Sequence, residues 1–216
     1  MNGALVMVVA ITLGFVLIGL VGPLLAQIRL RRTRSPTASD RAQLDARLPP
    51  LGFDPTRVVV IDTVGEASVE VSIRGVHGYR ILFVTDFVLE ELDAEVASAL
   101  FAAEVARARL WYREFQVVAA GIVIALGTAS LILLVPFELG FGGLLIAAVV
   151  LFAIGRRLQY RADAQAAAIV GAEVIADAFE TVGELHGADL SRGGWRTYLQ
   201  VQPGLGDRIY RLRQRS

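Results

Sequence analysis

The chain lacks several residue types on which common functional sites depend. None of its 216 residues is cysteine, which excludes disulfides, thiolate metal sites and cysteine nucleophiles. Its only histidines, His77 and His186, are far apart in sequence. Lysine is absent, so every basic residue is arginine, and no basic stripe interleaved with aromatic residues is present. Nothing therefore indicates a nucleic-acid partner.

Charge is balanced while apolar residues are in excess. There are 21 basic and 21 acidic residues, and 55% of the chain is hydrophobic. Soluble domains are usually about 45–50% apolar. Because the excess is concentrated in three blocks, it indicates an integral membrane protein. The rest of the chain is long enough for one small domain.

Three apolar blocks predict three membrane-crossing helices. Residues 4–28 carry no charge and are long enough to cross the hydrocarbon core. A cleaved signal peptide would have a basic start and a shorter apolar run, so an uncleaved anchor is favoured. Residues 115–155 contain a single charge, Glu138, and predict a transmembrane hairpin that turns at 136–140. The return arm, 141–154, is short for a full crossing, so the alternatives are a start at Leu139 or a thinned bilayer. The alternative is a buried helical hairpin of a soluble protein.

Arginines mark one end of each predicted span. They are Arg29, Arg31, Arg32 and Arg34 after the first span, Arg107, Arg109 and Arg113 before the second, and Arg156, Arg157 and Arg161 after the third. The N-terminus and the Glu138 turn carry none. Because basic residues favour the cytoplasmic side, the pattern predicts a multi-pass protein of the cell membrane with its N-terminus outside.

The polar segments predict a small α+β domain in the cytoplasm, made of residues 51–114 and 156–216. Residues 29–50 are polar and contain prolines, which predicts a linker, with one helical turn around residues 40–48. Three runs with the alternation or β-branching of strands predict a short β-meander. These runs are residues 57–62, 68–74 and 79–84.

Helices are expected after the strands. Asp93 is a candidate N-cap, and Glu95 in the first turn favours the helix dipole. This helix is expected to continue through Trp111 into the second span. Residues 156–186 keep helical spacing of apolar residues and predict another long helix, and residues 207–212 predict a short last one.

The order of these parts resembles the family of membrane-bound zinc endopeptidases that includes HtpX and the CAAX prenyl endopeptidases. That family has strands, an H-E-x-x-H helix, two spans, an E-x-x-A-D motif and a late H-P with E-R-I. The matching segments here are residues 84–93 before the motif helix, 99–107 on it, 159–163, 202–203 and 207–209. The resemblance covers residues 50–216 and implies three spans with a gluzincin-like cytoplasmic domain.

The resemblance fails at the zinc ligands. Ala103 and Arg107 stand at the two histidine positions, and Gln159 stands at the position of the third ligand. Alanine has no donor atom, arginine is always protonated, and glutamine is a poor zinc ligand. Glu104 keeps the general-base position, and Asp163 is a candidate for a supporting or pairing role. Arg208 is a second such candidate, and no metal or other cofactor is expected.

Three hypotheses follow. The first is an inactive relative of the family that binds lipid and a membrane protein or an extended peptide, the latter added as a strand. The second is an active zinc endopeptidase with atypical ligands, and the third is an unrelated three-span protein. Under the first, Arg107 is predicted to replace the metal as a cation paired with Glu104, Asp163 or both.

Overall fold

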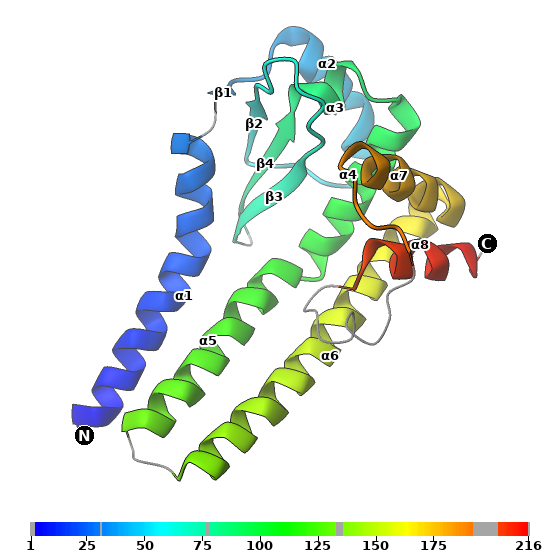
Figure 1. Cartoon of the computed structure of the whole chain (residues 1–216). Helices are drawn as coiled ribbons and strands as arrows, with labels where there is room; N and C mark the ends of the chain where they lie inside the picture. The colour runs from blue at the N-terminus through cyan, green and yellow to red at the C-terminus, as the bar shows by residue number, and fades with distance from the viewer. Residues whose placement is uncertain (1–2, 31, 77, 133–135, 192–202, 216) are drawn as a thin grey trace.

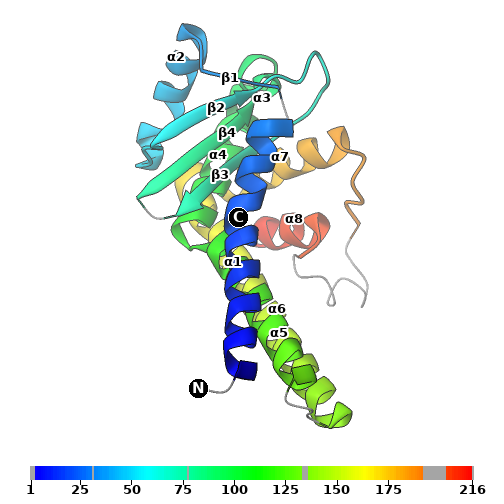
Figure 2. The same cartoon turned by 90° about the vertical axis from the view of Figure 1, so that its left-hand side faces the viewer.

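The computed structural model describes residues 3–30, 32–76, 78–132, 136–191 and 203–215. The chain is mostly helical with one small sheet. Three long helices, α1 (Gly3–Leu30), α5 (Tyr112–Ile132) and α6 (Phe137–Val170), extend side by side away from a smaller domain (Figure 1). Figure 2 shows that α1 begins at the same end where α5 finishes and α6 begins, far from the sheet. The arginine-bearing ends therefore all lie toward the domain.

Two of the long helices are suited to cross a membrane. Tyr112–Ile132 and Glu138–Val170 each contain a window of mean hydropathy 2.1. Only 11% and 6% of the residues in these windows are buried by the rest of the protein. A core hairpin of a soluble protein would be mostly buried, so this alternative does not fit. The described side chains of α1 include a shorter apolar stretch, Leu5–Gly19.

The return arm of the hairpin is longer than the sequence predicted. Helix α6 begins at Phe137, not at 141, and continues without interruption past 155 into the domain. It ends where Gly171 takes a φ of 100°, a conformation that side chains other than glycine rarely adopt. The long helix predicted for 156–186 is therefore wrong as one element: its second half is a separate helix, α7 (Ala172–Leu185).

The sheet is not the predicted meander. Its strands are β1 (Thr33–Arg34), β2 (Arg57–Ile61), β3 (Val71–Val76) and β4 (Tyr79–Thr85), in the order β1-β2-β4-β3. β4 pairs in parallel with β2 and in antiparallel with β3. A meander would put β3 in the middle, but β4 has the continuous buried apolar run expected of a central strand. The half-buried, alternating β3 lies at the edge.

Residues 29–50 are more than a linker. They form β1, helix α2 (Ala38–Arg47) and the start of a 3₁₀ turn, Pro49–Leu51. Thr37 and Asp40 form a reciprocal capping box at the start of α2. Leu44 and Leu48 are buried in the main core of the domain. The buried leucines are spaced four residues apart, so α2 presents one apolar face to the domain.

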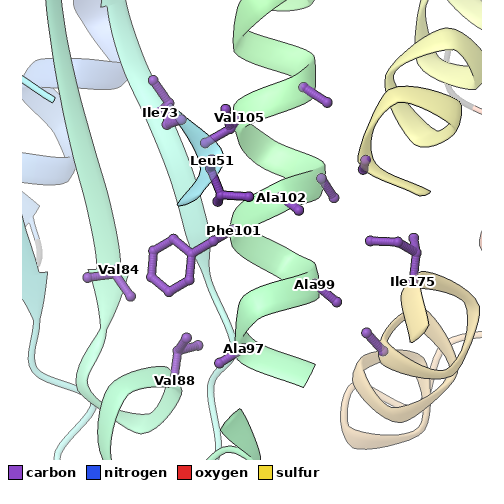
Figure 3. Close-up of a cluster of buried hydrophobic side chains, with 14 of the residues drawn as sticks. Leu51, Ile73, Val84, Val88, Ala97, Ala99, Phe101, Ala102, Val105 and Ile175 are labelled. Carbon is purple, nitrogen blue, oxygen red and sulfur yellow. The ribbon is translucent and has the colours of Figure 1, made fainter. Parts of the chain in front are cut away.

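Helix α4 (Ala94–Arg109) lies at the centre of the domain core. Asp93 caps it as predicted, since its carboxylate accepts hydrogen bonds from the backbone N–H groups of Glu95 and Val96. Figure 3 shows Phe101 of α4 packed between Val84 and Val88, which come from β4 and from helix α3 (Asp86–Glu90). The opposite face of α4 contacts α6 and α7. The last helix, α8 (Leu205–Arg213), packs on α7 and α6.

The predicted continuation of α4 through Trp111 into the second span is wrong. Helix α4 ends at Arg109, Trp111 has a φ of 55°, and α5 starts at Tyr112. Neither glycine nor proline marks this break in the sequence. Its consequence is that the first residues of α5 can turn back toward α4.

Candidate functional site

Glu104 lies on α4 beside the edge strand and is bound on both oxygens. Its side chain is buried, with a residue exposure of 3%. Its Oε2 accepts a hydrogen bond from Arg107 Nη1 at 2.9 Å, and its Oε1 accepts from the backbone N–H of Ile73 at 3.1 Å. Arg113 Nη2 donates to the same Oε1 at 3.3 Å. The carboxylate is thus held by two guanidinium groups and one amide.

The break before Tyr112 makes the Arg113 contact possible. In an unbroken helix, residues nine apart lie about 13.5 Å apart along the axis and on opposite faces. Because the chain leaves the helical path at Trp111, Arg113 reaches back to Glu104. The sequence had identified Arg113 only as an arginine at the start of a span.

Asp163 is held by Arg208, the other candidate for a pairing role, and not by Arg107. Arg208 of α8 donates to it from Nε at 2.8 Å and from Nη2 at 2.7 Å. Gln159, one turn earlier on α6, donates to the same carboxylate at 3.1 Å. Arg208 also lies over the ring of Phe179, 4.1 Å from its centroid. The side-chain amide of Gln159 is therefore used to hold Asp163.

Of the alternatives predicted for Arg107, which were pairing with Glu104, with Asp163 or with both, the structure shows pairing with Glu104. Its guanidinium pairs with Glu104, but no hydrogen bond or ion pair joins it to Asp163 within the described ranges. Burial lowers the pKa of Arg107, and the positive charge of Arg208 lowers it further, while Glu104 and Asp163 oppose these effects. The negative charges near Arg107 thus do not fully compensate for its burial and for its basic neighbour.

Four of the six predicted site residues line one cavity of about 340 Å³ between α4, α5, α6 and α8. They are Glu104, Arg107, Gln159 and Arg208. Asp163 lies behind Arg208, and Ala103 belongs to the apolar core. Sequence reasoning missed the other lining residues, which include Arg74 on β3 and Tyr112 on α5. Only the strand order and the break before α5 bring them here.

These residues do not fit a zinc ion. Ala103 offers no donor atom, and Arg107 is a cation whose guanidinium lies against Glu104. Gln159 uses its amide to hold Asp163. In the part of the chain that the structure describes, no three His, Cys, Asp or Glu side chains are grouped to hold a metal. His186 ends α7 on the surface, whereas His77 and Gln202 are outside the described residues.

Comparison with known proteins gives a match in fold and none in sequence. No protein-family model matches the chain, and no curated protein does. Among solved structures, the crystal structure of Ste24p from S. mikatae aligns with a TM-score of 0.74 and 12% sequence identity. The alignment covers 98% of this chain and 58% of Ste24p. At this identity the similarity concerns the fold alone, so nearly the whole chain has the fold of a little over half of Ste24p.

Proposed function

We propose that the chain is a membrane-embedded, peptidase-like protein without catalytic activity that acts by binding at the membrane. The observation that carries this proposal is the state of Glu104, whose two oxygens are held by Arg107, Arg113 and an amide. The fold similarity to Ste24p supports the resemblance to the membrane-bound zinc endopeptidases at the level of the fold.

The chemistry of Glu104 argues against hydrolysis. A general base in such a site removes a proton from metal-bound water, whose pKa is about 7, against about 16 for bulk water. The residues at the ligand positions cannot hold that metal. In addition, both carboxylate oxygens of Glu104 already accept hydrogen bonds from arginine side chains. Glu104 is therefore better suited to a structural role as an anchor for two arginines.

The fold also affects how an extended peptide could bind. Strand β3 is the edge of the sheet beside α4, where an added strand would pair. The Ile73 N–H, which points away from β4, already donates to Glu104. Because the Ile73 N–H is already bonded to Glu104, a strand added at β3 could not accept a hydrogen bond from it. Binding by strand addition is therefore disfavoured at this point of the edge.

The membrane topology is part of the proposal. All three long helices cross the membrane, the N-terminus is outside and the domain is in the cytoplasm, as the arginine distribution favours. A reporter fused after Ser216 is expected to score cytoplasmic, and one inserted at Glu138 is expected to score external. The opposite result at either site rejects this orientation.

Zinc content of the purified chain tests the absence of catalysis. The unmodified chain is expected to carry no stoichiometric zinc, and Glu104→Gln is expected to change neither zinc content nor hydrolysis of unfolded protein substrates. Zinc at one ion per chain, or hydrolysis that disappears in Glu104→Gln, would overturn the proposal.

A variant designed to bind zinc tests whether Ala103, Arg107 and Gln159 stand at the ligand positions of the family. The triple change Ala103→His, Arg107→His and Gln159→Glu installs the ligand types of the family, and it is expected to bind one zinc ion per chain. The single change Ala103→His is the control and is expected to bind none. A folded triple variant without zinc, checked by circular dichroism, would show that these positions do not correspond to the ligands of the family.

A further inference from the structure

The cavity beside Glu104 carries an excess of positive charge. Among the residues that the structure describes, its lining contains the carboxylate of Glu104 and the guanidinium groups of Arg107, Arg113 and Arg208. Asp163 adds a second carboxylate behind Arg208. Two carboxylates do not balance these three guanidinium groups. The excess is held in place by the fold, because the three arginines come from α4, α5 and α8.

Buried donor atoms at this cavity include the Oη of Tyr112 and the Nε of Arg107. Neither atom has a hydrogen-bond partner among the residues that the structure describes. Tyr112 is 3% exposed, yet it lines the cavity. An unsatisfied buried donor costs about 1–3 kcal/mol. Water could satisfy the hydroxyl, but it would leave the charge imbalance unchanged.

We propose that this cavity binds the phosphoryl group of an anionic ligand, through Arg107, Arg113, Arg208 and the hydroxyl of Tyr112. A phosphate offers several acceptor oxygens and a negative charge, which match the unpaired donors and the net positive charge of the three arginines over the two carboxylates. Guanidinium groups bind phosphate oxygens in pairs, and each keeps donors that its carboxylate partner does not use. The inference rests on the proposed non-catalytic role and names the ligand class of that site.

The position of the cavity allows two sources of the phosphoryl group. Tyr112 and Arg113 are the first residues of α5, a candidate membrane span. Their level is therefore that of the membrane surface, where phospholipid head groups lie. A soluble phosphate compound could reach the same level from the water.

The test uses the full chain in an uncharged detergent, in buffer free of phosphate. Calorimetric titration with inorganic phosphate measures binding from solution. Native mass spectrometry after exposure to vesicles of phosphatidylglycerol or phosphatidylcholine measures retention of lipid. Tyr112→Phe removes only the hydroxyl, and Arg113→Gln removes one charge. Their controls, Tyr79→Phe and Arg57→Gln, change exposed residues that do not line the cavity.

Tyr112→Phe is expected to weaken binding about ten-fold, since a hydrogen bond to a charged group is lost. Without ligand it is expected to unfold at the same or a higher temperature, because its hydroxyl has no protein partner; a merely structural hydroxyl would lower that temperature. Arg113→Gln is expected to weaken binding as well, and both controls are expected to bind normally.

Each of the two binding measurements tests one source of the phosphoryl group. Binding of inorganic phosphate that Tyr112→Phe weakens supports a soluble ligand. Retention of phosphatidylglycerol over phosphatidylcholine, weakened by the same change and without phosphate binding, supports a lipid head group. Failure of the unmodified chain to bind either probe, or equal binding by Tyr112→Phe and Tyr79→Phe, would overturn the inference. Zinc content of the same sample bears on the proposed function alone, so the two proposals fail separately.

Discussion

Arg208 of α8 donates two hydrogen bonds to the carboxylate of Asp163 of α6, from Nε at 2.8 Å and from Nη2 at 2.7 Å. Both side chains are nearly buried, with exposures of 11% and 5%. This pair ties the C-terminal helix α8 to the half of α6 that lies in the domain. Two carboxylates, Asp163 and Glu104, thereby each have their own arginine partner.

Loss of the ion pair between Arg208 and Asp163 should destabilise the domain. Arg208→Ala leaves a buried carboxylate with only the amide of Gln159, and it is expected to cost about 3–5 kcal/mol of unfolding free energy. Arg208→Lys is expected to recover only part of the loss, because an ammonium cannot form the two-pronged contact. Detergent-based unfolding followed by circular dichroism measures both. Exposed Arg215→Ala is the control, and an equal effect there would contradict the prediction.

Glu104 should matter more for stability than Arg107. Arg107→Ala leaves Glu104 with Arg113 and the Ile73 amide, so we expect a loss of about 1–3 kcal/mol. Glu104→Ala leaves two guanidinium groups without their carboxylate, and a loss of about 3–5 kcal/mol is expected. The same unfolding measurement ranks them. The reverse order would mean that Arg107 has a further partner.

The matched control for these two variants is Arg161→Ala, which changes an exposed arginine on α6. Arg109 is unsuitable as a control because its guanidinium donates to the backbone carbonyls of Leu51 and Gly52.

The stability of the folded chain should fall in acid, because Asp40 becomes protonated there. Burial raises the pKa of Asp40, but hydrogen bonds from Arg34 and Thr37 outweigh it, so the net pKa lies below the ordinary 3.8. The unfolded state then binds the proton more readily. The stabilisation is present above about pH 4 and is lost as pH falls through the lowered pKa.

Asp40→Asn is therefore expected to lower stability at neutral pH and to flatten its dependence on pH below 4. Unfolding midpoints between pH 2.5 and 7 measure this change. Asp45→Asn, an exposed residue on the same helix, is expected to keep the slope of the unmodified chain. A parallel pH profile in Asp40→Asn would rule out the assignment.

Gly121 should control how closely α1 approaches α5. A Cβ at this position would meet Cγ2 of Val16 at 2.8 Å, which is too short for a relaxed contact. Small residues at such contacts let membrane helices pack closely. Gly121→Leu is therefore expected to separate the two helices, while Gly143→Leu, whose surroundings are open within 4 Å, is not.

Because the chain has no cysteine, disulfide crosslinking can report this separation directly. A pair made by Gly19→Cys and Val117→Cys spans the same helix contact, since a Cβ at Gly19 lies 3.2 Å from Val117. The crosslink yield is expected to fall several-fold with Gly121→Leu. An unchanged yield would show that Gly121 does not set the helix separation.

The sequence by itself determined the features that depend on composition and local pattern. Apolar length predicted helices at the two hairpin arms, and the Asp93 cap follows from its position before an apolar-periodic run. The loss of ligand chemistry at Ala103, Arg107 and Gln159 is likewise a property of residue type. Such features need no knowledge of distant neighbours.

Only the tertiary structure determined which side chains pair and which strands are neighbours. Asp163 and Arg208 are distant in sequence, and nothing local indicates that they meet. The central place of β4 depends on competition among strands for burial. Trp111 has a left-handed conformation that redirects Tyr112 and Arg113, and neither glycine nor proline marks this break in the sequence. These outcomes are set by packing between segments that local sequence patterns treat as independent, so the charge of the cavity became visible only in the folded chain.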